Sequence, residues 1–216
     1  MSVCGLQRRV KSDINRLASV CSAGISGTKA EPDHDAAEHL KEKLWNSENF
    51  EQWNETYNTD VTAVYFTTVA FLPLLQAGTN KRGHLSASTI VISSMSGIMR
   101  HAQGHFSYNA AKGATVHLTK LMSAEFQKLG VRVNSIAPGY FPSEMTAKES
   151  RSDQKSELPA EKVQEKGHVP AQRPGTDEEM AQAVVSWNAK YTLQSSLSLT
   201  VIFDQKLLCQ WRDFGC

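Results

Sequence analysis

The chain has 216 residues, of which 40% are apolar and 21% charged, a composition that fits one ordinary folded domain. Lysine and arginine together number 23 and aspartate and glutamate 22, giving a formal net charge of +1, so the basic excess typical of nucleic-acid binding is absent. The longest apolar run, residues 61–75, contains threonines and Pro73 and is shorter than the ~20 residues of a membrane span, so we predict no membrane-spanning helix. Residues 1–17 lack the apolar core of a secretory signal, which favours the cytoplasm.

Cysteine and histidine are not spaced as metal ligands. The four cysteines form no C-x-x-C pair and have no histidines at zinc spacing. His101, His105 and His117 lack partner carboxylates or cysteines at ligand spacing, and their pattern is that of ordinary loop and helix residues. We therefore predict neither a disulfide framework nor a metal site.

The first half of the chain alternates between strand and helix patterns. Residues 1–16 are typical of the end of a charged helix, and the apolar stretch 17–21 predicts a strand that leads into a turn. From residue 35 apolar residues recur at three- and four-residue steps, which predicts a long helix ending near Pro73. Residues 89–92 are β-branched without polar alternation, as in a strand buried on both faces.

The alternation continues beyond residue 100. A helix is predicted for residues 107–129, bounded by Gly104 and Gly130, and a strand follows at 131–136. Because strands alternate with helices, the sequence predicts an α/β fold built around a parallel sheet.

The pattern after Pro138 is less regular. Residues 148–166 are rich in Ser, Glu and Lys without an apolar period, which predicts a mobile flap in place of a packed element. Residues 176–187 predict a helix and residues 196–203 a strand. We treat residues 1–216 as a single domain whose end, residues 186–216, is a divergent tail.

Three reactive side chains are predicted to share one crevice. The segment YNAAK at residues 108–112 puts Tyr108 and Lys112 four positions apart, so both face the same side of a helix. On its own, this spacing is usually that of a solvated or half-buried surface pair. Ser94 follows the buried strand at its carboxyl end, where open α/β sheets bind their ligands.

The order and spacing of four segments resemble the short-chain dehydrogenase/reductase family: ISSMSG at 92–97, YNAAK at 108–112, VNSIAPG at 133–139 and RPGTD at 173–177. The resemblance covers about residues 14–185, and residues 66–75 are similar to fungal members of the 3-oxoacyl-reductase type. It implies a Rossmann-type parallel sheet with flanking helices.

The resemblance also implies an NAD(P)-dependent oxidoreductase that interconverts a carbonyl and a secondary alcohol, with NADP or NAD as cofactor. Tyr108 would be the general acid and base, Lys112 would lower its pKa and bind the nicotinamide ribose, and Ser94 would hold the substrate oxygen. A free phenol has a pKa of ~10, and lowering it by three units needs about 4 kcal/mol, which Lys112 and a cationic nicotinamide ring could share.

Further cofactor contacts are implied after the third motif. Pro138 and Gly139 would turn the chain so that the backbone near Phe141 and the hydroxyl of Ser143 meet the nicotinamide half of the cofactor. The alternative is a plain strand-to-loop turn, since Pro-Gly is a strong turn signal. If the fungal similarity holds, the expected substrates are carbonyls of secondary metabolism.

The sequence departs from the family at the cofactor phosphates. No two of the 13 glycines are separated by a single residue, so the Gly-x-Gly fingerprint is absent. The strand at 17–21 resembles the family's fourth, so the first three strands are expected to be missing and the sheet to be incomplete. Since the family's strand order is 3-2-1-4-5-6-7, the remaining strands would be contiguous, with the strand at 17–21 as an apolar edge that invites another chain.

Two local substitutions add to this departure. Where the family has Asn-Asn-Ala-Gly, this chain has CSAG at residues 21–24. Asp60 stands where the family has the asparagine that holds a water of the proton relay, and we count it with the catalytic residues. An ionised Asp60 near Tyr108 would raise the pKa of the phenol, whereas an Asp60 that faces solvent would not.

Two functions therefore stay open. The first is the oxidoreductase, with Ser94, Tyr108, Lys112 and Asp60 as its catalytic residues. The second is a catalytically inactive truncated member that acts through association with a full-length partner. The helices predicted around residues 50–75 and 107–129 often form the subunit interface in the family, so a homo-oligomer through them is expected.

Overall fold

The structure is a computed structural model that describes residues 18–30, 32, 36–82, 86–147, 156–165, 169, 171–189 and 199–202. The helix predicted for residues 1–16 and the tail after residue 203 lie outside the described residues.

Four parallel strands form one sheet in the order β1-β2-β3-β4. Their bounds are β1 (Ala18–Cys21), β2 (Ala87–Ile92), β3 (Val131–Pro138) and β4 (Leu199–Ile202). The predicted α/β class, the parallel sheet and the contiguous set of strands are confirmed. β2 and β3 are almost wholly buried, which agrees with their β-branched sequences.

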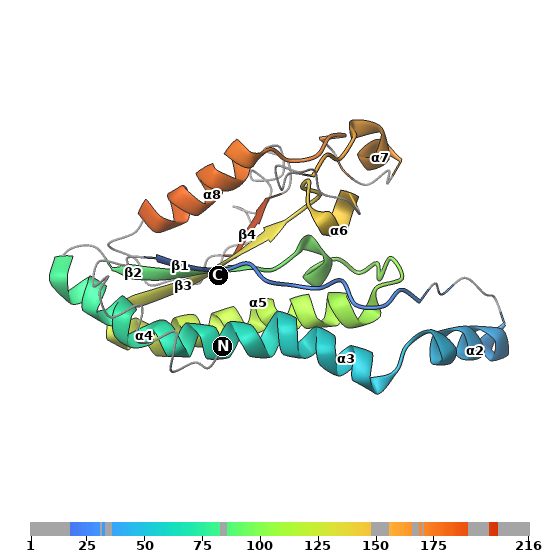
Figure 1. The fold of residues 1–216 in the computed structure, drawn as a ribbon, viewed down its shortest axis with the longest axis horizontal. Coiled ribbons are helices and arrows are strands. Elements are labelled where there is room, and N and C mark those ends of the chain that lie inside the picture. Colours follow the sequence, from blue (N-terminus) through green and yellow to red (C-terminus); the bar gives the residue numbers. More distant parts are fainter. Residues whose placement is uncertain are drawn as a thin grey trace, which may run out of the picture.

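Helices cover both faces of the sheet (Figure 1). On one face lie α4 (Ala63–Arg82) and α5 (Phe106–Phe126), which pack on the strands, while α8 (Asp177–Ala189) packs on the other face. A π-helical turn, η1 (Asn58–Thr62), joins α3 (Phe50–Tyr57) to α4 without a break. The remaining helices are α2 (Ala37–Ser47), η2 (Met95–Gly97), η3 (Gln127–Leu129), α6 (Glu144–Ala147) and α7 (Ala160–Gln164).

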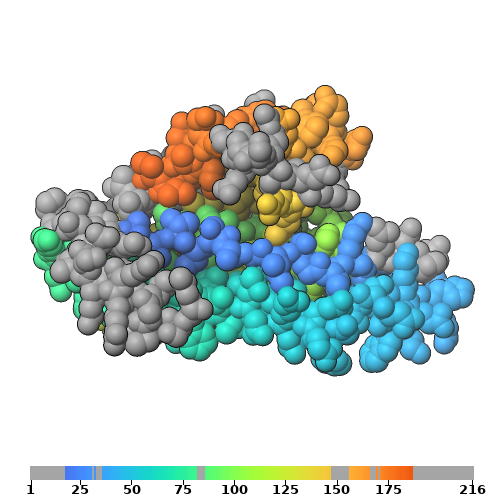
Figure 2. Space-filling view, viewed as in Figure 1, coloured from blue at the N-terminus to red at the C-terminus, as the bar shows by residue number. Residues whose placement is uncertain are grey.

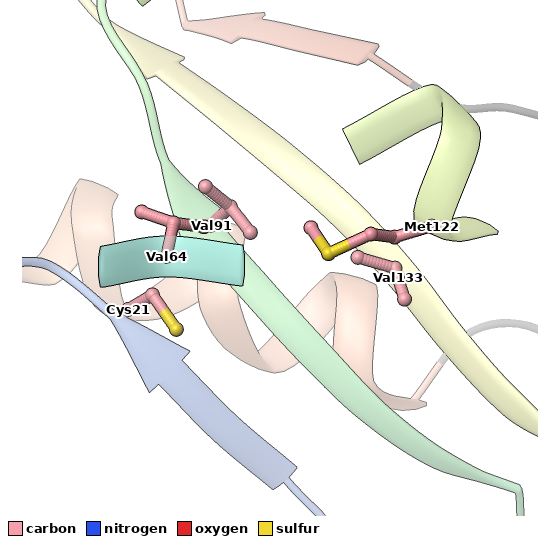
Figure 3. Packing of buried hydrophobic residues seen from close by; sticks show 5 residues of the cluster. All are labelled: Cys21, Val64, Val91, Met122 and Val133. Carbon is pink, nitrogen blue, oxygen red and sulfur yellow. The ribbon is translucent and has the colours of Figure 1, made fainter. Parts of the chain in front are cut away.

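The core lies between the sheet and the α4–α5 layer. One cluster joins residues from three strands and two helices, as Figure 3 shows: Cys21, Val64, Val91, Met122 and Val133. Burial raises the pKa of the Cys21 thiol, so this cysteine stays protonated and packs as a small apolar side chain. A second cluster contains Leu75, Ala87 and Val131.

β1 is an edge strand within the described part of the chain. It pairs with β2 on one side only, and Val20 is 48% exposed. In Figure 2 the blue residues of β1 and the loop after it lie at the surface between the α4 layer and α8. The predicted apolar edge is present.

The helix predicted to end near Pro73 continues to Arg82, so that boundary was wrong. Proline removes one backbone hydrogen bond and clashes with the preceding turn, at a cost of about 3 kcal/mol in a helix interior. Pro73 is exposed, so water can satisfy the carbonyl that loses its partner. Leu75, two residues later, is 2% exposed and packs on β2 and β3, and this burial favours continuation of the helix.

Of the flap predicted for residues 148–166, residues 148–155 and 166 lie outside the described residues, and the described part needs correction. It includes the short helix α7, in which Val163 is 1% exposed and therefore packed. A single buried valine in a polar segment leaves no periodic pattern, so this contact could not be predicted from the sequence. The described helix at α8 and the strand β4 agree with the predictions for residues 176–187 and 196–203.

The helical stretch Phe50–Lys81 is long and apolar enough to cross a membrane by length and composition alone. This stretch is longer than the apolar run at residues 61–75 because α3, η1 and α4 form one continuous helix. One such helix is weak evidence for a span, since core and interface helices of soluble proteins pass the same test. Its buried side chains include Asp60, which has a partner from α5.

Gly130 ends η3 in a left-handed conformation with φ +68°, directly before β3. A Cβ there would lie 2.9 Å from Thr79 Cγ2, and Thr79 Oγ1 donates a hydrogen bond to the Gly130 carbonyl. We expect Gly130→Ala to lower the free energy of unfolding by about 1–2 kcal/mol, the usual cost of a left-handed L-residue. Urea denaturation would measure this, with Gly130→Asn as the milder control. Equal stability of Gly130→Ala and the parent chain would contradict it.

Candidate active site

Ser94 lies just beyond the carboxyl end of β2. Beyond Ile92 the chain leaves the sheet, and Ser94 caps the turn η2, where its Oγ accepts a hydrogen bond from the Ser96 N–H at 3.1 Å. The Ser94 hydroxyl is within hydrogen-bonding reach of the Tyr108 phenol and lowers its pKa. The neighbouring hydroxyl of Ser93 is buried and has no hydrogen-bond partner among the described residues. Ser94 is therefore the serine that meets the phenol.

Tyr108 and Lys112 lie on successive turns of α5. Lys112 is only 4% exposed, and its Nζ lies 5.6 Å from the centroid of the Tyr108 ring. The same ammonium contacts the Ile92 carbonyl oxygen at 3.4 Å, which ties the helix to the end of β2. The structure thus brings the predicted Ser94, Tyr108 and Lys112 together. Lys112 is buried and Tyr108 is half-buried, so the two do not form a solvated surface pair.

Asp60 lies in the π-helical turn η1 and is fully buried. Its Oδ1 is 3.4 Å from Lys112 Nζ and accepts a hydrogen bond from the Ile25 N–H at 3.1 Å. Thr115 of α5 donates to the Asp60 backbone carbonyl at 2.8 Å, so the turn is fastened to the same helix as the tyrosine. The alternative in which Asp60 faces solvent is wrong. Its Oδ2 has no hydrogen-bond partner among the described residues.

One part of the expected electrostatics of the phenol agrees with the structure and one part does not. Burial raises the pKa of Tyr108, the contact with Ser94 lowers it, and the charge of Asp60 raises it, as predicted for an ionised Asp60 near the phenol. Lys112 was expected to lower this pKa, but its ammonium is paired with Asp60, whose charge acts in the opposite direction. Burial likewise raises the pKa of Asp60, against the lowering effect of Lys112.

The turn at residues 22–27 leaves room for this ion pair. A Cβ on Gly24 would lie 2.7 Å from Asp60 Oδ1 and 2.9 Å from Lys112 Nζ, so a side chain there would displace both groups. A Cβ on Gly27, which has φ +64°, would lie 2.7 Å from Ser107 Oγ and 2.8 Å from Thr56 Oγ1. The sequence indicated the turn but not its role in holding the pair, because the three partners are far apart along the chain.

Phe141 and Ser143 lie beyond the end of β3, on the side of α6. The Ser143 hydroxyl is 3.1 Å from Thr146 Oγ1 and accepts from the Thr146 N–H at 3.3 Å, so it caps α6. The ring of Phe141 packs against Gly175, where any Cβ would overlap it. These contacts fix the segment, and the role of both residues in cofactor binding stays a prediction.

The RPGTD motif explains how the start of α8 is held. Thr176 and Glu179 exchange backbone and side-chain hydrogen bonds as a capping pair, and Arg173 forms two hydrogen bonds to the Glu179 carboxylate. These bonds hold the pKa of Glu179 at about 2. The motif thus anchors α8 next to Phe141. The described residues contain no group of three or more His, Cys, Asp or Glu side chains that could hold a metal.

A model of the short chain dehydrogenase family matches residues 20–154, well over half of the chain. The chain belongs to this family. The match includes Asp60, Ser94, Tyr108 and Lys112.

Among curated relatives, this chain is 38% identical over 133 residues to the short-chain dehydrogenase/reductase PhomF of Diaporthe leptostromiformis, covering 59% of this chain and 44% of that protein. It is 33% identical over 182 residues to the short-chain dehydrogenase/reductase SAT3 of Stachybotrys chartarum, covering 77% and 66% respectively. The chain therefore spans between about half and two-thirds of the length of these relatives. It is also 34% identical over 135 residues to the 3-oxoacyl-[acyl-carrier-protein] reductase FabG of Vibrio harveyi, covering 62% of this chain and 49% of that protein.

Among solved structures, the fold resembles the RhlG/NADP active-site complex of Pseudomonas aeruginosa, with a TM-score of 0.71. The sequences are 22% identical, and the alignment covers 94% of this chain and 73% of that chain. At this identity the likeness supports the fold alone. It agrees with the Rossmann-type sheet expected from the four motifs.

Proposed function

We propose that this dehydrogenase chain reduces a carbonyl to a secondary alcohol, or runs the reverse reaction, with NADP or NAD as cofactor. The observation that carries the proposal is the convergence of Ser94, Tyr108 and Lys112 at the carboxyl end of β2. The hydrogen bond between the serine and the phenol and the buried ammonium beside the ring are the groups that such proton transfer requires. Family membership supports the same reaction class.

The residues fit the nicotinamide end of the cofactor. Lys112 has three N–H donors, and contacts with Asp60 and Ile92 use two of them, so one donor can serve a ribose hydroxyl. When bound, the cofactor supplies the hydride. This sequence has no Gly-x-Gly segment for the pyrophosphate, and Phe141 and Ser143 are the further residues that would contact the nicotinamide half.

The proposed roles of the residues follow from their contacts. Ser94 donates a hydrogen bond to the substrate carbonyl and stabilises the developing negative charge on its oxygen. Tyr108 donates the proton to that oxygen, and its raised pKa keeps the phenol protonated near neutral pH, the form needed for reduction. Lys112 is held beside the ring by Asp60, whose charge also raises the pKa of Tyr108.

The substrate class rests on similarity. PhomF and SAT3 are fungal proteins, and carbonyl groups of fungal secondary metabolism are the class we propose. The experiment is a turnover assay at the nicotinamide absorbance band, with NADPH or NADH and a panel of ketones and quinones. Turnover with at least one carbonyl supports the proposal. An absence of both turnover and cofactor binding would favour the truncated, inactive member that docks on a full-length relative.

Replacing Asp60 by asparagine tests the electrostatic part of the proposal. The charge of Asp60 raises the pKa of Tyr108, so Asp60→Asn is expected to lower that pKa. The alkaline limb of the kcat profile should then move to lower pH, because the phenol that donates the proton ionises sooner. A pH series on the parent chain and the variant measures the shift. A profile that stays in place, or moves to higher pH, would contradict this assignment.

We also propose that a second copy covers the exposed apolar side chains of α4 and α5. Tyr65, Phe66 and Leu121 are 41%, 64% and 54% exposed on the two helices that cover one sheet face. Exposed apolar clusters of this kind mark association sites. We expect sedimentation equilibrium to show a dimer or larger assembly, and Phe66→Arg to shift it to monomer. A monomeric parent chain would contradict the proposal.

A further inference from the structure

The turn that carries Ser94 touches α5 at a glycine. Gly97, the last residue of η2, faces the peptide group between Lys112 and Gly113. A Cβ built on Gly97 would lie 2.5 Å from the Lys112 carbonyl carbon and 2.7 Å from the Gly113 nitrogen, whereas ordinary contact begins at 3.4 Å. These are backbone atoms in the middle of a helix, so they cannot rotate out of the way.

The turn behaves as one unit because it is closed by its own hydrogen bonds. The Gly97 N–H donates to the Ser94 carbonyl at 3.1 Å, and the Ser96 N–H donates to Ser94 Oγ at the same distance. The Ile98 N–H donates to the Met95 carbonyl at 2.9 Å. A displacement of Gly97 away from α5 therefore carries Ser94 with it.

The helix on the other side of this contact, α5, also carries Tyr108. Tyr108 lies one helical turn before Lys112 on α5, and its phenol is within hydrogen-bonding reach of Ser94. The distance between η2 and α5 thus determines whether this bond forms. We propose that Gly97 is a positioning residue: because it has no Cβ, η2 can lie against the Lys112–Gly113 peptide, and this contact sets the Ser94–Tyr108 hydrogen bond.

The effect of Gly97 on turnover rests on the proposed function. Its effect on the Ser94–Tyr108 hydrogen bond does not, because that bond can be measured without cofactor or substrate. The chain has five tyrosines, so labelling with tyrosine carrying ¹³C at Cζ gives few resonances. The resonance missing in Tyr108→Phe identifies Tyr108. Its chemical shift at neutral pH and its titration both report on the hydrogen bond.

Gly97→Ala is expected to change the Tyr108 resonance as Ser94→Ala does and to raise the pKa of Tyr108, because the Ser94 hydrogen bond lowers it. In the Ser94→Ala background, Gly97→Ala should have no further effect, since the bond is already lost. A purely structural disturbance would add to the effect of Ser94→Ala. An additive change, or no change in the parent background, would overturn the proposal.

Gly113→Ala is the matched control on the other side of the contact. Its Cβ would lie 3.3 Å from the Gly97 carbonyl oxygen, which requires an adjustment of only a few tenths of an ångström, so the Tyr108 resonance should stay near its parent position. Gly113→Val places a larger side chain in the same contact and should shift the resonance in the direction of Ser94→Ala. If Gly97→Ala does not fold, an unshifted Gly113→Val overturns the proposal. If Gly97→Ala shifts the Tyr108 resonance as expected but the parent chain shows no turnover, the proposed function is contradicted and the role of Gly97 is not.

Discussion

Tyr108→Phe is expected to reduce turnover by about 10²–10⁴-fold, the usual contribution of a positioned general acid. The substitution removes one oxygen atom and leaves the ring that packs beside Lys112. Cofactor binding should therefore change little, and the loss should appear in kcat. Steady-state turnover at the nicotinamide absorbance band measures it.

The control for this experiment is Tyr57→Phe, which removes a phenol hydroxyl from α3, where the ring stacks on Trp53. We expect it to keep the turnover of the parent chain. Turnover of Tyr108→Phe within a factor of about two of the parent chain would remove the tyrosine from the mechanism, since general acids of this kind contribute far more than that.

Lys112→Met is expected to destabilise the fold by about 3–5 kcal/mol, the typical result of removing one partner of a buried ion pair. The carboxylate of Asp60 is fully buried and would keep only the hydrogen bond from the Ile25 N–H. The lysine is itself buried, so solvent does not screen the pair. Urea denaturation of the two chains measures the difference.

The pH dependence of this loss has a definite sign. Burial raises the pKa of Asp60 in the folded chain above its unfolded value, and Lys112 opposes that shift. Without the lysine the folded pKa rises further, so the variant favours the protonated carboxyl and loses stability as the pH rises through the folded pKa. The destabilisation should thus be larger at pH 8 than at pH 5.

Two further variants separate the buried pair from general effects of charge. Lys128→Met removes an exposed lysine that pairs with Glu125, and it should leave the unfolding midpoint unchanged. Adding Asp60→Asn to Lys112→Met removes the uncompensated charge and should recover much of the loss. A Lys112→Met chain as stable as the parent at pH 8 would show that the pair does not form.

The strands and the helix that carries Tyr108 and Lys112 could be predicted because their signals are local. Residues 89–92 are β-branched throughout, and Tyr108 and Lys112 are separated by one helical turn, so neither inference needed a distant contact. The position of Ser94 followed from the general rule that ligands bind at the carboxyl ends of parallel strands.

The features that the sequence did not predict depend on contacts between distant segments. The pair formed by Asp60 and Lys112 joins α5 to a π-helical turn, and only the placement of both elements shows that the lysine is paired with this carboxylate. Continuation of α4 beyond Pro73 depends on burial of Leu75 against strands that come later in the chain. The close contact at Gly97 likewise needs the helix backbone to be in position.

The central claim is that the crevice formed by Ser94, Tyr108 and Lys112 binds a nicotinamide cofactor although the chain has no Gly-x-Gly segment. The most direct test is titration of the full chain into NADPH and, separately, NADH, followed by the fluorescence of the reduced nicotinamide ring. We predict a saturable change with at least one of them, which Lys112→Met weakens. A fluorescence signal that shows no saturable binding of either cofactor to the folded parent chain would contradict the account.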